Sequence, residues 1–375
     1  MAIPRIAITM GDPAGIGPEI VLKAASRLRS RVAARELALV VTGAAWCLAE
    51  AAERLGVEYP FVAVPQEPAT ASWPPFAVLD LGLAASGIVP GEVSAAAGEV
   101  AYQAIAAAVR MAMAGQVHAI STAPINKEAL NLAGHHYSGH TELLAALTGS
   151  RDSVMMLAHG LMRVSHISTH VALADVPRYL TEPRLRRVVE LTADALRRLD
   201  IARPRIGVAA LNPHAGENGL FGREDIDITA PALQRLRADG YDVEGPVPGD
   251  TVFVKLHAGQ FDAVVAMYHD QGHIPVKLLG FAVDPSSGGW SALNGVNITL
   301  GLPLVRTSVD HGTAFDIAGK GIASEQSLVD AIEFALRLAR APSGAGANTR
   351  YAKTTGDEDI ASARPEGGLR RLHGA

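Results

Sequence analysis

Short apolar runs alternate with amphipathic helical patterns along almost the whole chain, and this alternation limits the class of fold. The apolar runs read as strands at 6–9, 37–42, 76–79, 117–121, 154–157, 162–167, 205–211, 262–267, 296–300 and 305–308. The helical patterns between them lie at 18–28, 44–55, 93–113, 182–199, 226–238, 251–258 and 325–338. Strands separated by helices are typical of parallel sheets, because each crossover helix covers one face of the sheet. We therefore expect an α/β protein with mostly parallel sheets.

Length and composition narrow the possibilities further. At 375 residues the chain is long enough for two domains. The net charge of -5 argues against a general nucleic-acid-binding surface. No apolar run reaches the roughly 18 residues that a membrane-spanning helix needs, so no membrane partner is expected. The single cysteine, Cys47, allows no intrachain disulfide, which favours a cytoplasmic protein. Periodicity stops at Ser343, so 343–375 is expected to be an extended or disordered tail.

Three apolar runs lead into a histidine. The first two end in His170 and His214, and the third is followed by the turn-prone segment 268–277, which begins Tyr-His269-Asp-Gln-Gly. Open α/β sheets bind ligands beyond the carboxyl ends of their strands. Three protein ligands and one open position are typical of catalytic zinc, so the three imidazoles are candidate metal ligands. From the residues alone, hydrogen-bonded histidines of the core or surface remain the alternative.

Two aspartates stand beside these candidate ligands. Asp250 and Asp270 are suited to orient an imidazole or to bind the ion directly. The structural alternatives are a helix N-cap for Asp250, in front of the helix expected at 251–258, and a turn residue for Asp270.

Several polar residues lie where an anion could bind. Lys127 follows a strand and opens a helix, and helix amino ends favour anions. His140 and Thr141 begin another expected helix, where they could contact a substrate or simply cap the helix. Lys277, Asn297 and Arg306 form a later polar set in apolar surroundings. A buried Arg306 needs a partner, which is either a bound anion or an internal salt bridge.

Two loops are rich in backbone donors. The turn at 10–19 contains Gly-x-Gly, but Ile20 stands where a dinucleotide fingerprint needs its third glycine. A tight turn and a binding loop are equally compatible with it. The loop at 308–321 could wrap a nucleotide without such a fingerprint.

Together these segments resemble the 4-hydroxythreonine-4-phosphate dehydrogenase family, from about residue 6 to residue 338. The motifs that carry the resemblance are Gly-Asp-Pro-Ala-Gly-Ile-Gly-Pro-Glu at 11–19, Thr-Ala-Pro-Ile-Asn-Lys-Glu at 122–128, Gly-His-Thr-Glu at 139–142, Asn-Pro-His-Ala-Gly-Glu-Asn at 212–218, His-Asp-Gln-Gly at 269–272 and Gly-Val-Asn-Ile-Thr-Leu-Gly-Leu-Pro at 295–303. The 311–321 loop also resembles the adenosine-binding loop of isopropylmalate and isocitrate dehydrogenases, the wider superfamily.

The resemblance implies a two-domain α/β/α fold of the isocitrate/isopropylmalate dehydrogenase type, with the active site in the interdomain cleft. Residues 1–125 and 296–342 would form the nucleotide-side domain, and 126–295 the metal and dimer side. A homodimer with the active site shared across its interface is implied as well.

The resemblance also assigns residues. It places the divalent metal on His170, His214 and His269, with Zn²⁺ as the first choice and Mg²⁺, Mn²⁺ or Co²⁺ as alternatives. It places the substrate on His140, Thr141, Lys277, Asn297 and Arg306. NAD, or NADP, would lie near the 311–321 loop, with Asp310, His311, Gly312, Thr313 and Asp316 as candidate contacts. Asp250, Asp270 and Lys277 are the candidate catalytic residues.

The chain departs from the biosynthetic members in two places. His273 follows Gly272, where those members usually have an apolar residue, and an insertion spans about 282–293. These features resemble catabolic paralogues that act on threonate or erythronate 4-phosphate. A dihydrodiol-dicarboxylate dehydrogenase shares His-Ile-Pro at 273–275 but generally lacks the His-Thr and Asn/Arg set.

The expected function is NAD- and metal-dependent oxidation of a 4-phosphorylated hydroxy acid of the 4-hydroxythreonine 4-phosphate type, with decarboxylation to a phosphorylated ketone. Threonate or erythronate 4-phosphate is the alternative substrate. A noncatalytic sugar-phosphate or nucleotide-binding protein is the rival class, and a metal-dependent phosphatase or aldolase is the rival enzyme.

Overall fold

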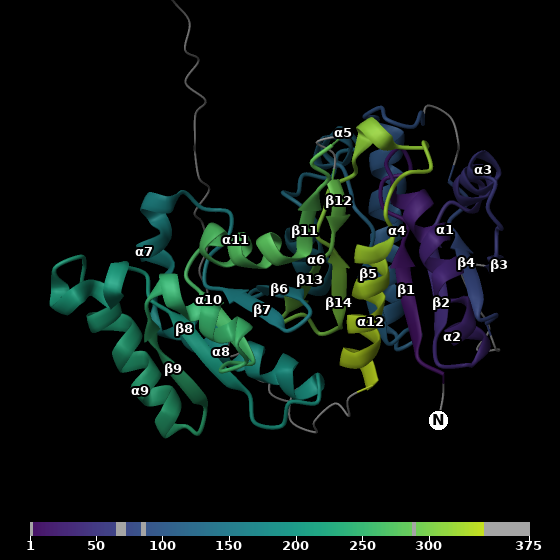
Figure 1. The fold of residues 1–375 in the computed structure, drawn as a ribbon. Helices are drawn as coiled ribbons and strands as arrows, with labels where there is room; N and C mark the ends of the chain where they lie inside the picture. The colour runs from purple at the N-terminus through teal and green to yellow at the C-terminus, as the bar shows by residue number, and fades with distance from the viewer. Residues whose placement is uncertain (1–2, 65–72, 84–87, 287–289, 341–375) are drawn as a thin grey trace, which may run out of the picture. The chain divides into compact units, whose positions relative to one another are not determined.

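The computed structural model describes residues 3–64, 73–83, 88–286 and 290–340 (Figure 1). The side chains of 290–293 and the tail expected at 343–375 lie outside the described residues. Among the described residues, no helix is long and apolar enough to cross a membrane.

Twelve of the described strands form one continuous sheet in the order β3-β4-β2-β1-β5-β14-β13-β6-β7-β10-β8-β9. Their bounds are β1 Arg5–Thr9, β2 Ala38–Gly43, β3 Val62–Val64, β4 Phe76–Asp80, β5 Ala119–Thr122, β6 Val154–His159, β7 Met162–His166, β8 Arg205–Ala209, β9 Asp242–Val247, β10 Ala263–Ala266, β13 Val296–Leu300 and β14 Arg306–Val309. At the two ends of the insertion expected at about 282–293, β11 (Phe281–Val283) and β12 (Trp290–Leu293) pair as a separate antiparallel ribbon.

Helices cover both faces of the sheet. They are α1 Gly17–Arg27, α2 Arg29–Ala33, α3 Ala45–Leu55, α4 Ala95–Met113, α5 Lys127–Leu132, α6 His140–Thr148, α7 Val176–Tyr179, α8 Glu182–Arg198, α9 Ala230–Ala238, α10 Gly249–His257, α11 His269–Gly280 and α12 Gln326–Arg340. Alternation along the strands directs successive side chains to opposite faces, which is why two helical layers can bury one sheet. The α/β class with mostly parallel pairing is therefore confirmed.

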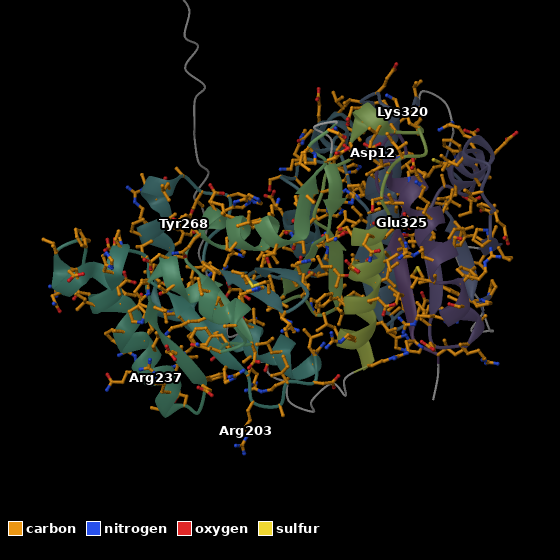
Figure 2. The ribbon with its side chains drawn as sticks, in the orientation of Figure 1. Asp12, Arg203, Arg237, Tyr268, Lys320 and Glu325 are labelled. Carbon is orange, nitrogen blue, oxygen red and sulfur yellow. The ribbon has the colours of Figure 1, made fainter. Side chains whose placement is uncertain are left out.

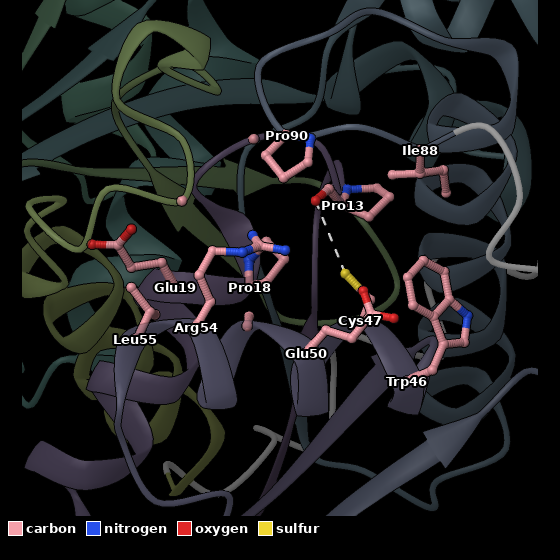
Figure 3. Close-up of a pocket in the computed structure, with 13 residues that line it drawn as sticks. Pro13, Pro18, Glu19, Trp46, Cys47, Glu50, Arg54, Leu55, Ile88 and Pro90 are labelled. Carbon is pink, nitrogen blue, oxygen red and sulfur yellow. Dashed lines mark hydrogen bonds between the residues drawn. The ribbon is translucent and has the colours of Figure 1, made fainter.

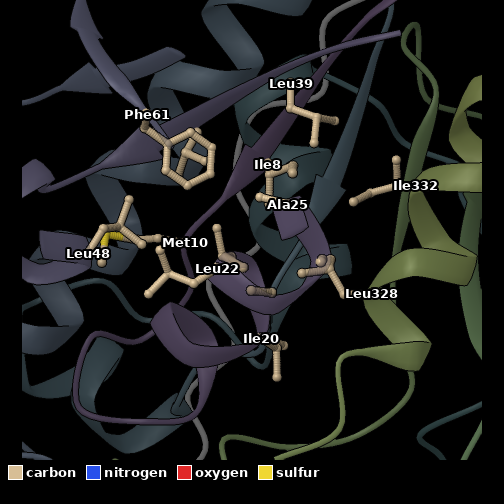
Figure 4. Packing of buried hydrophobic residues seen from close by; sticks show 14 of the residues in the cluster. Ile8, Met10, Ile20, Leu22, Ala25, Leu39, Leu48, Phe61, Leu328 and Ile332 are labelled. Carbon is tan, nitrogen blue, oxygen red and sulfur yellow. The ribbon is translucent and has the colours of Figure 1, made fainter. Parts of the chain in front are cut away.

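The core follows this alternation. Ile6 and Ile8 of β1 pack with α1, α3 and α12 on one face (Figure 4), while Ala7 packs with α4 and α6 on the other. In the second half of the sheet, α8 and α9 cover one face, and α10 and α11 cover the other. The division into two domains that the resemblance implies stays a prediction.

The sheet changes direction in its middle. The strands β3, β4, β2, β1, β5 and β14 run parallel to one another, and so do β7, β10, β8 and β9. Between these blocks, β13 is antiparallel to both of its neighbours, and β6 is antiparallel to β7. The two parallel blocks therefore run in opposite directions, and their carboxyl ends lie on opposite sides of the sheet.

Most expected elements form, with ends shifted by a residue or two, and β13 has the expected bounds. One expectation was wrong: 268–277, read as turn-prone, is mostly helix, because α11 begins at His269 and continues through Pro275. The three-residue strand β3 and the six-residue strand β9 were not expected. β9 contains Gly245 and Pro246, two residues that weaken a strand signal.

Candidate functional site

A buried guanidinium without a carboxylate partner marks the site. Arg306 of β14 is 2% exposed, and its two terminal nitrogens donate to hydroxyls, Nη1 to Thr299 Oγ1 at 2.9 Å and Nη2 to Thr122 Oγ1 at 2.7 Å. Its Nε has no hydrogen-bond partner, and no ion pair between described residues includes it. Burial lowers the pKa of Arg306 to about 9. A buried cation of this kind favours an incoming anion over the internal salt bridge left open by the sequence.

A row of polar side chains crosses the sheet beside Arg306. In register, Thr9 of β1 lies opposite Thr122 of β5, Thr122 opposite Ser308 of β14, and Ser308 opposite Asn297 of β13. Ser308 is two residues from Arg306 and so points to the same face. Thr9 Oγ1 and Asn297 Oδ1 are buried atoms without hydrogen-bond partners. Unused polar atoms in a buried row indicate a place for a polar ligand.

The start of α6 lies against this row. His140, its first residue, is partly exposed, but its Nε2 is buried and has no partner. Burial, followed by the nearby Arg306 charge, lowers the pKa of His140 well below its usual value, so the imidazole is neutral. Thr141 stands in the same first turn, and no side chain caps this helix. The helix amino end therefore adds free backbone donors to the charge of Arg306.

Lys277 and Asp310 form an ion pair just beyond the last residue of β14. The distance from Lys277 Nζ to Asp310 Oδ2 is 3.7 Å, and the Asp310 side chain is 10% exposed. Burial raises the pKa of Asp310, and the Lys277 charge opposes that shift. Asp310, one of the expected cofactor contacts, thus has the candidate substrate residue Lys277 as its partner in the chain.

Two of the three candidate metal ligands lie together. The rings of His170, after β7, and His269, at the start of α11, have centroids 5.9 Å apart. The Nδ1 of His269 lies 2.7 Å from Asp270 Oδ1, which leaves Nε2 free for a ligand. The exposed His214, whose ring is 6.3 Å from that of Phe221, does not join them. Among the described residues, no group of three or more His, Cys, Asp or Glu side chains is placed to hold a metal.

The loop that carries His214 has a rare backbone. From His214 to Asn218 every residue has a positive φ, four of them non-glycine. Such a left-handed stretch costs roughly 1–2 kcal/mol per non-glycine residue, so its surroundings must enforce it. The buried carboxylate of Asp225 accepts hydrogen bonds from the backbone N–H groups of Leu211 and Asn212, both at 2.9 Å. Sequence reasoning missed Asp225, because only the folded chain brings its carboxylate to the backbone of Leu211 and Asn212.

The two candidate aspartates differ in their surroundings. Asp250 is exposed in the first turn of α10, and Pro248, not Asp250, occupies the N-cap position, so the capping alternative was wrong. Asp270 lies in the first turn of α11 rather than in an irregular turn, and it contacts His269.

The two donor-rich loops contact each other. The backbone N–H of Ile16 donates to Thr313 O at 3.0 Å, and a Cβ on Gly15 would stand only 2.9 Å from that oxygen. Gly15 in the turn at 10–19 thus serves close packing within the chain, which favours the tight-turn alternative. His311 is partly buried, and burial lowers its pKa, whereas Gly312 and Asp316 are exposed.

A small pocket adjoins these loops (Figure 3). It lies between the glycine-rich turn at 10–19, helix α3 and the segments around Pro90 and Gly319. Its wall includes Trp46, Glu50 and Arg54. Cys47 is buried there, with its Sγ 3.9 Å from Pro13 O, and burial raises the pKa of Cys47 to about 12. This thiol is a packing group.

Helix α11 runs along the central strands of the sheet, from the end of β10 to the end of β6. Tyr268, labelled in Figure 2, marks its start beside the end of β10, and Gly280 ends it near His159 of β6 and Asn294. His269 and Lys277 are eight residues apart on this helix, a rise of about 12 Å. The histidine pair and the Arg306 site are therefore separate clusters joined by one helix face.

Comparison with known proteins gives consistent matches. The family model described as pyridoxal phosphate biosynthetic protein PdxA matches residues 35–335, which include the candidate metal, substrate, cofactor and catalytic residues expected from the sequence but not Thr9. A candidate D-threonate 4-phosphate dehydrogenase of Bradyrhizobium diazoefficiens is 63% identical over 340 residues, 90% of this chain and 98% of that protein. The D-threonate 4-phosphate dehydrogenase of Pectobacterium atrosepticum is 48% identical over 337 residues, 89% of this chain and 99% of that protein. The solved structure of 4-hydroxythreonine-4-phosphate dehydrogenase from Klebsiella pneumoniae is 46% identical, with a TM-score of 0.75, and the match covers 90% of this chain and 100% of that one.

Proposed function

Because the chain belongs to the PdxA family, we propose that it oxidises a 4-phosphorylated hydroxy acid with a nicotinamide cofactor and a divalent metal, and then decarboxylates the product. The chain is an oxidoreductase acting on a CH–OH group, as its dehydrogenase relatives are. The proposal concerns which substrate, cofactor and metal it uses, and which residues hold them.

The observation that carries the proposal is the buried, unpaired guanidinium of Arg306. A phosphate ester supplies the anionic charge that this group lacks, and phosphate oxygens can also accept from Thr122, from Thr9 and from the free N–H groups of α6. The neutral His140 can add one more hydrogen bond.

Two substrates fit this site. D-threonate 4-phosphate is favoured, because the relatives named for it include one that is 63% identical. 4-Hydroxythreonine 4-phosphate is the second candidate, after the relative of known structure. Either molecule carries a second anionic group, the carboxylate, for which the Lys277 ammonium is the proposed partner.

The proposed cofactor is NAD, with NADP as the alternative. His311, Gly312, Thr313 and Asp316 remain the proposed contacts, supported by the exposure of Gly312 and Asp316 and by the adjoining pocket. Asp310 stays among the proposed cofactor contacts, and it also pairs with Lys277.

One chain supplies only two of the three proposed metal ligands. His170 and His269 present two imidazoles to a common space, and the contact with Asp270 leaves Nε2 of His269 available. We propose that a homodimer completes the site, with His214 reaching in from the partner subunit on its stiff, exposed loop. Zn²⁺ is the first choice for three imidazoles.

Each residue has a defined part in the proposed reaction. When bound, the divalent ion would supply Lewis acidity at the substrate hydroxyl and the new ketone, and the nicotinamide would accept the hydride. Arg306 and His140 hold the phosphate, and Lys277, kept in place by Asp310, holds the carboxylate. Oxidation at the carbon β to the carboxylate yields a β-keto acid. Its C–C bond to the carboxylate then breaks, carbon dioxide leaves, and the electron pair stays on the α carbon until a proton replaces it.

The test is an NAD reduction assay with D-threonate, erythronate and 4-hydroxythreonine 4-phosphates, each with added zinc, magnesium or manganese. The proposal expects NADH from at least one phosphate ester and none from the unphosphorylated acid. Release of phosphate or cleavage to an aldehyde without NADH would instead support the phosphatase or aldolase. Binding without turnover would support the noncatalytic protein. A cytoplasmic location, favoured by the lone cysteine, belongs to the same proposal.

A further inference from the structure

Four histidines form a column that the proposed reaction uses only at one end. His170 and His269 are the candidate metal ligands, and the ring of His273 stacks on that of His269, with centroids 3.7 Å apart and an interplanar angle of 10°. The ring of His166 follows, with its centroid 4.7 Å from that of His273. His166 and His273 are 0% and 5% exposed. Two buried imidazoles behind a candidate ligand call for a physical explanation.

The column depends on how α11 sits on the sheet. His269, His273 and Lys277 are spaced four residues apart and so share one face of α11. Gly272 lets this helix approach β7, because a Cβ there would overlap Nε2 of His166 and stand 2.8 Å from Val164 Cγ1. This close approach of α11 to β7 places the ring of His273 next to that of His166.

His269 is thereby restrained in two ways. At the edge of the ring, Nδ1 is held by Asp270 Oδ1 at 2.7 Å. On the face of the ring, the nearly parallel imidazole of His273 blocks rotation, and His273 is itself fixed because its Nδ1 donates to the carbonyl oxygen of His269 at 2.9 Å. An edge contact alone leaves the ring free to swing about that contact, whereas an added face contact sets its plane.

We propose that His273 is a positioning residue that sets the ring plane of His269 for metal binding, with His166 as the buried support behind it. The inference rests on the metal site of the proposed function and adds to it a residue that neither binds the ion nor touches substrate. Groups that orient a metal-ligating imidazole typically change metal affinity by about 10–100-fold.

The experiment measures zinc affinity, by competition with a chromophoric chelator, in the full-length protein at a concentration where its oligomeric state has been established. His273→Leu removes the flat ring and should weaken zinc binding by about 10-fold or more. His273→Phe keeps a flat ring without a metal-binding nitrogen and should bind zinc nearly as tightly as the wild type. His257→Leu, on an exposed position of α10, is the matched control and should leave the affinity unchanged.

The outcomes separate the inference from its premise. If the wild type binds zinc and His273→Leu binds it equally tightly, the inference is wrong and the metal site stands. If His273→Phe is as weak as His273→Leu, with both variants unfolding at the wild-type temperature, face stacking is not what holds His269. If the wild type binds neither zinc, manganese nor cobalt, the metal site itself is wrong.

Discussion

At the scale of single residues, the most informative groups are those whose burial has no structural justification. Arg306 is the clearest case among the described residues. A buried charge without a counter-ion lowers the free energy of unfolding unless a ligand supplies the opposite charge. A binding role and a structural role for such a residue predict opposite effects on stability.

The first prediction separates these roles. Arg306→Met should unfold at the same temperature as the wild type or higher, because it removes an unpaired buried charge. Its kcat/KM for the phosphorylated substrate should fall by about 10–100-fold or more, the equivalent of one lost charged hydrogen bond of roughly 1.5–3 kcal/mol. Thermal unfolding and steady-state kinetics check the two effects. The control is Arg203→Met, because Arg203 projects from the surface (Figure 2). A large loss of stability in Arg306→Met would contradict the binding role.

The second prediction concerns Asp12, in the turn after β1. Burial raises the pKa of this carboxyl to about 6 from 3.8, although the Ala14 and Asn126 backbone N–H groups oppose the shift. Its contribution to stability is therefore complete below about pH 4 and is lost as the pH rises through about 6. Asp12→Asn should match the wild type at pH 4 and be more stable by about 3 kcal/mol at pH 8.

Urea unfolding of both proteins at several pH values measures this difference. Asp316→Asn, at an exposed position, is the control and should show no such trend. A stability difference for Asp12→Asn that shrinks as the pH rises would contradict the assigned burial effect.

At the scale of elements, the glycine-rich turn and the 313–315 loop behave as one unit. The sequence could not decide whether those glycines bind a ligand or allow a tight turn, because both uses need the same residue. The contact of Gly15 with Thr313, 298 residues away in the chain, favours the tight turn.

The third prediction tests this packing. Gly15→Ala would place a Cβ 2.9 Å from Thr313 O and 3.0 Å from Thr313 Cβ, so it should destabilise the protein by about 1–3 kcal/mol. Gly312→Ala, in the neighbouring loop, meets no atom within 4 Å and should change stability little. Chemical unfolding of the two variants is the measurement. Equal stabilities would show that the first turn can move away from the loop.

Sequence reasoning recovered most elements but misread the one that joins the two clusters. Strand β10 was found because its residues form a continuous apolar run, and β13 because apolar and polar residues alternate along it, and both patterns are strong local signals. Helix α11 was missed because Gly272 and Pro275 are signals of a turn, and the helix is stabilised by packing on β6 and β7 that no local pattern reports. His273 was noticed as an unusual residue, but its stacking on His269 needs that helix.

At the scale of the whole molecule, the sequence predicted a mostly parallel sheet but not its reversal at β13 and β6. Because of this reversal, the carboxyl ends of β7 and β10 lie on one side of the sheet and those of β5 and β14 on the opposite side. Strand directions depend on pairing between distant segments, and apolar patterns carry no such information. β7, β8 and β10, whose ends lead into the three candidate histidines, all belong to one parallel block, yet His214 does not join His170 and His269 within the chain. The proposed function therefore places His214 in the site of a partner subunit.

The fourth prediction tests that requirement. His214→Ala and His269→Ala should each abolish metal-dependent turnover while the fold is kept. If His214 acts across the interface, a mixed dimer of the two variants contains one intact site. Unfolding and refolding an equal mixture should then restore about a quarter of the wild-type activity, since half of the dimers are mixed and each has one of two sites. No recovery, with mixed dimers demonstrated by differential tagging, would place all three ligands in one chain.

The most direct test of the whole account is NADH formation from D-threonate 4-phosphate by wild-type protein before and after removal of its metal. The account predicts NADH together with carbon dioxide in the metal-containing protein, almost none after chelation, and recovery when zinc or another divalent ion is returned. Unchanged NADH formation by the fully chelated protein, or no NADH from any 4-phosphorylated hydroxy acid in the presence of metal, would contradict it.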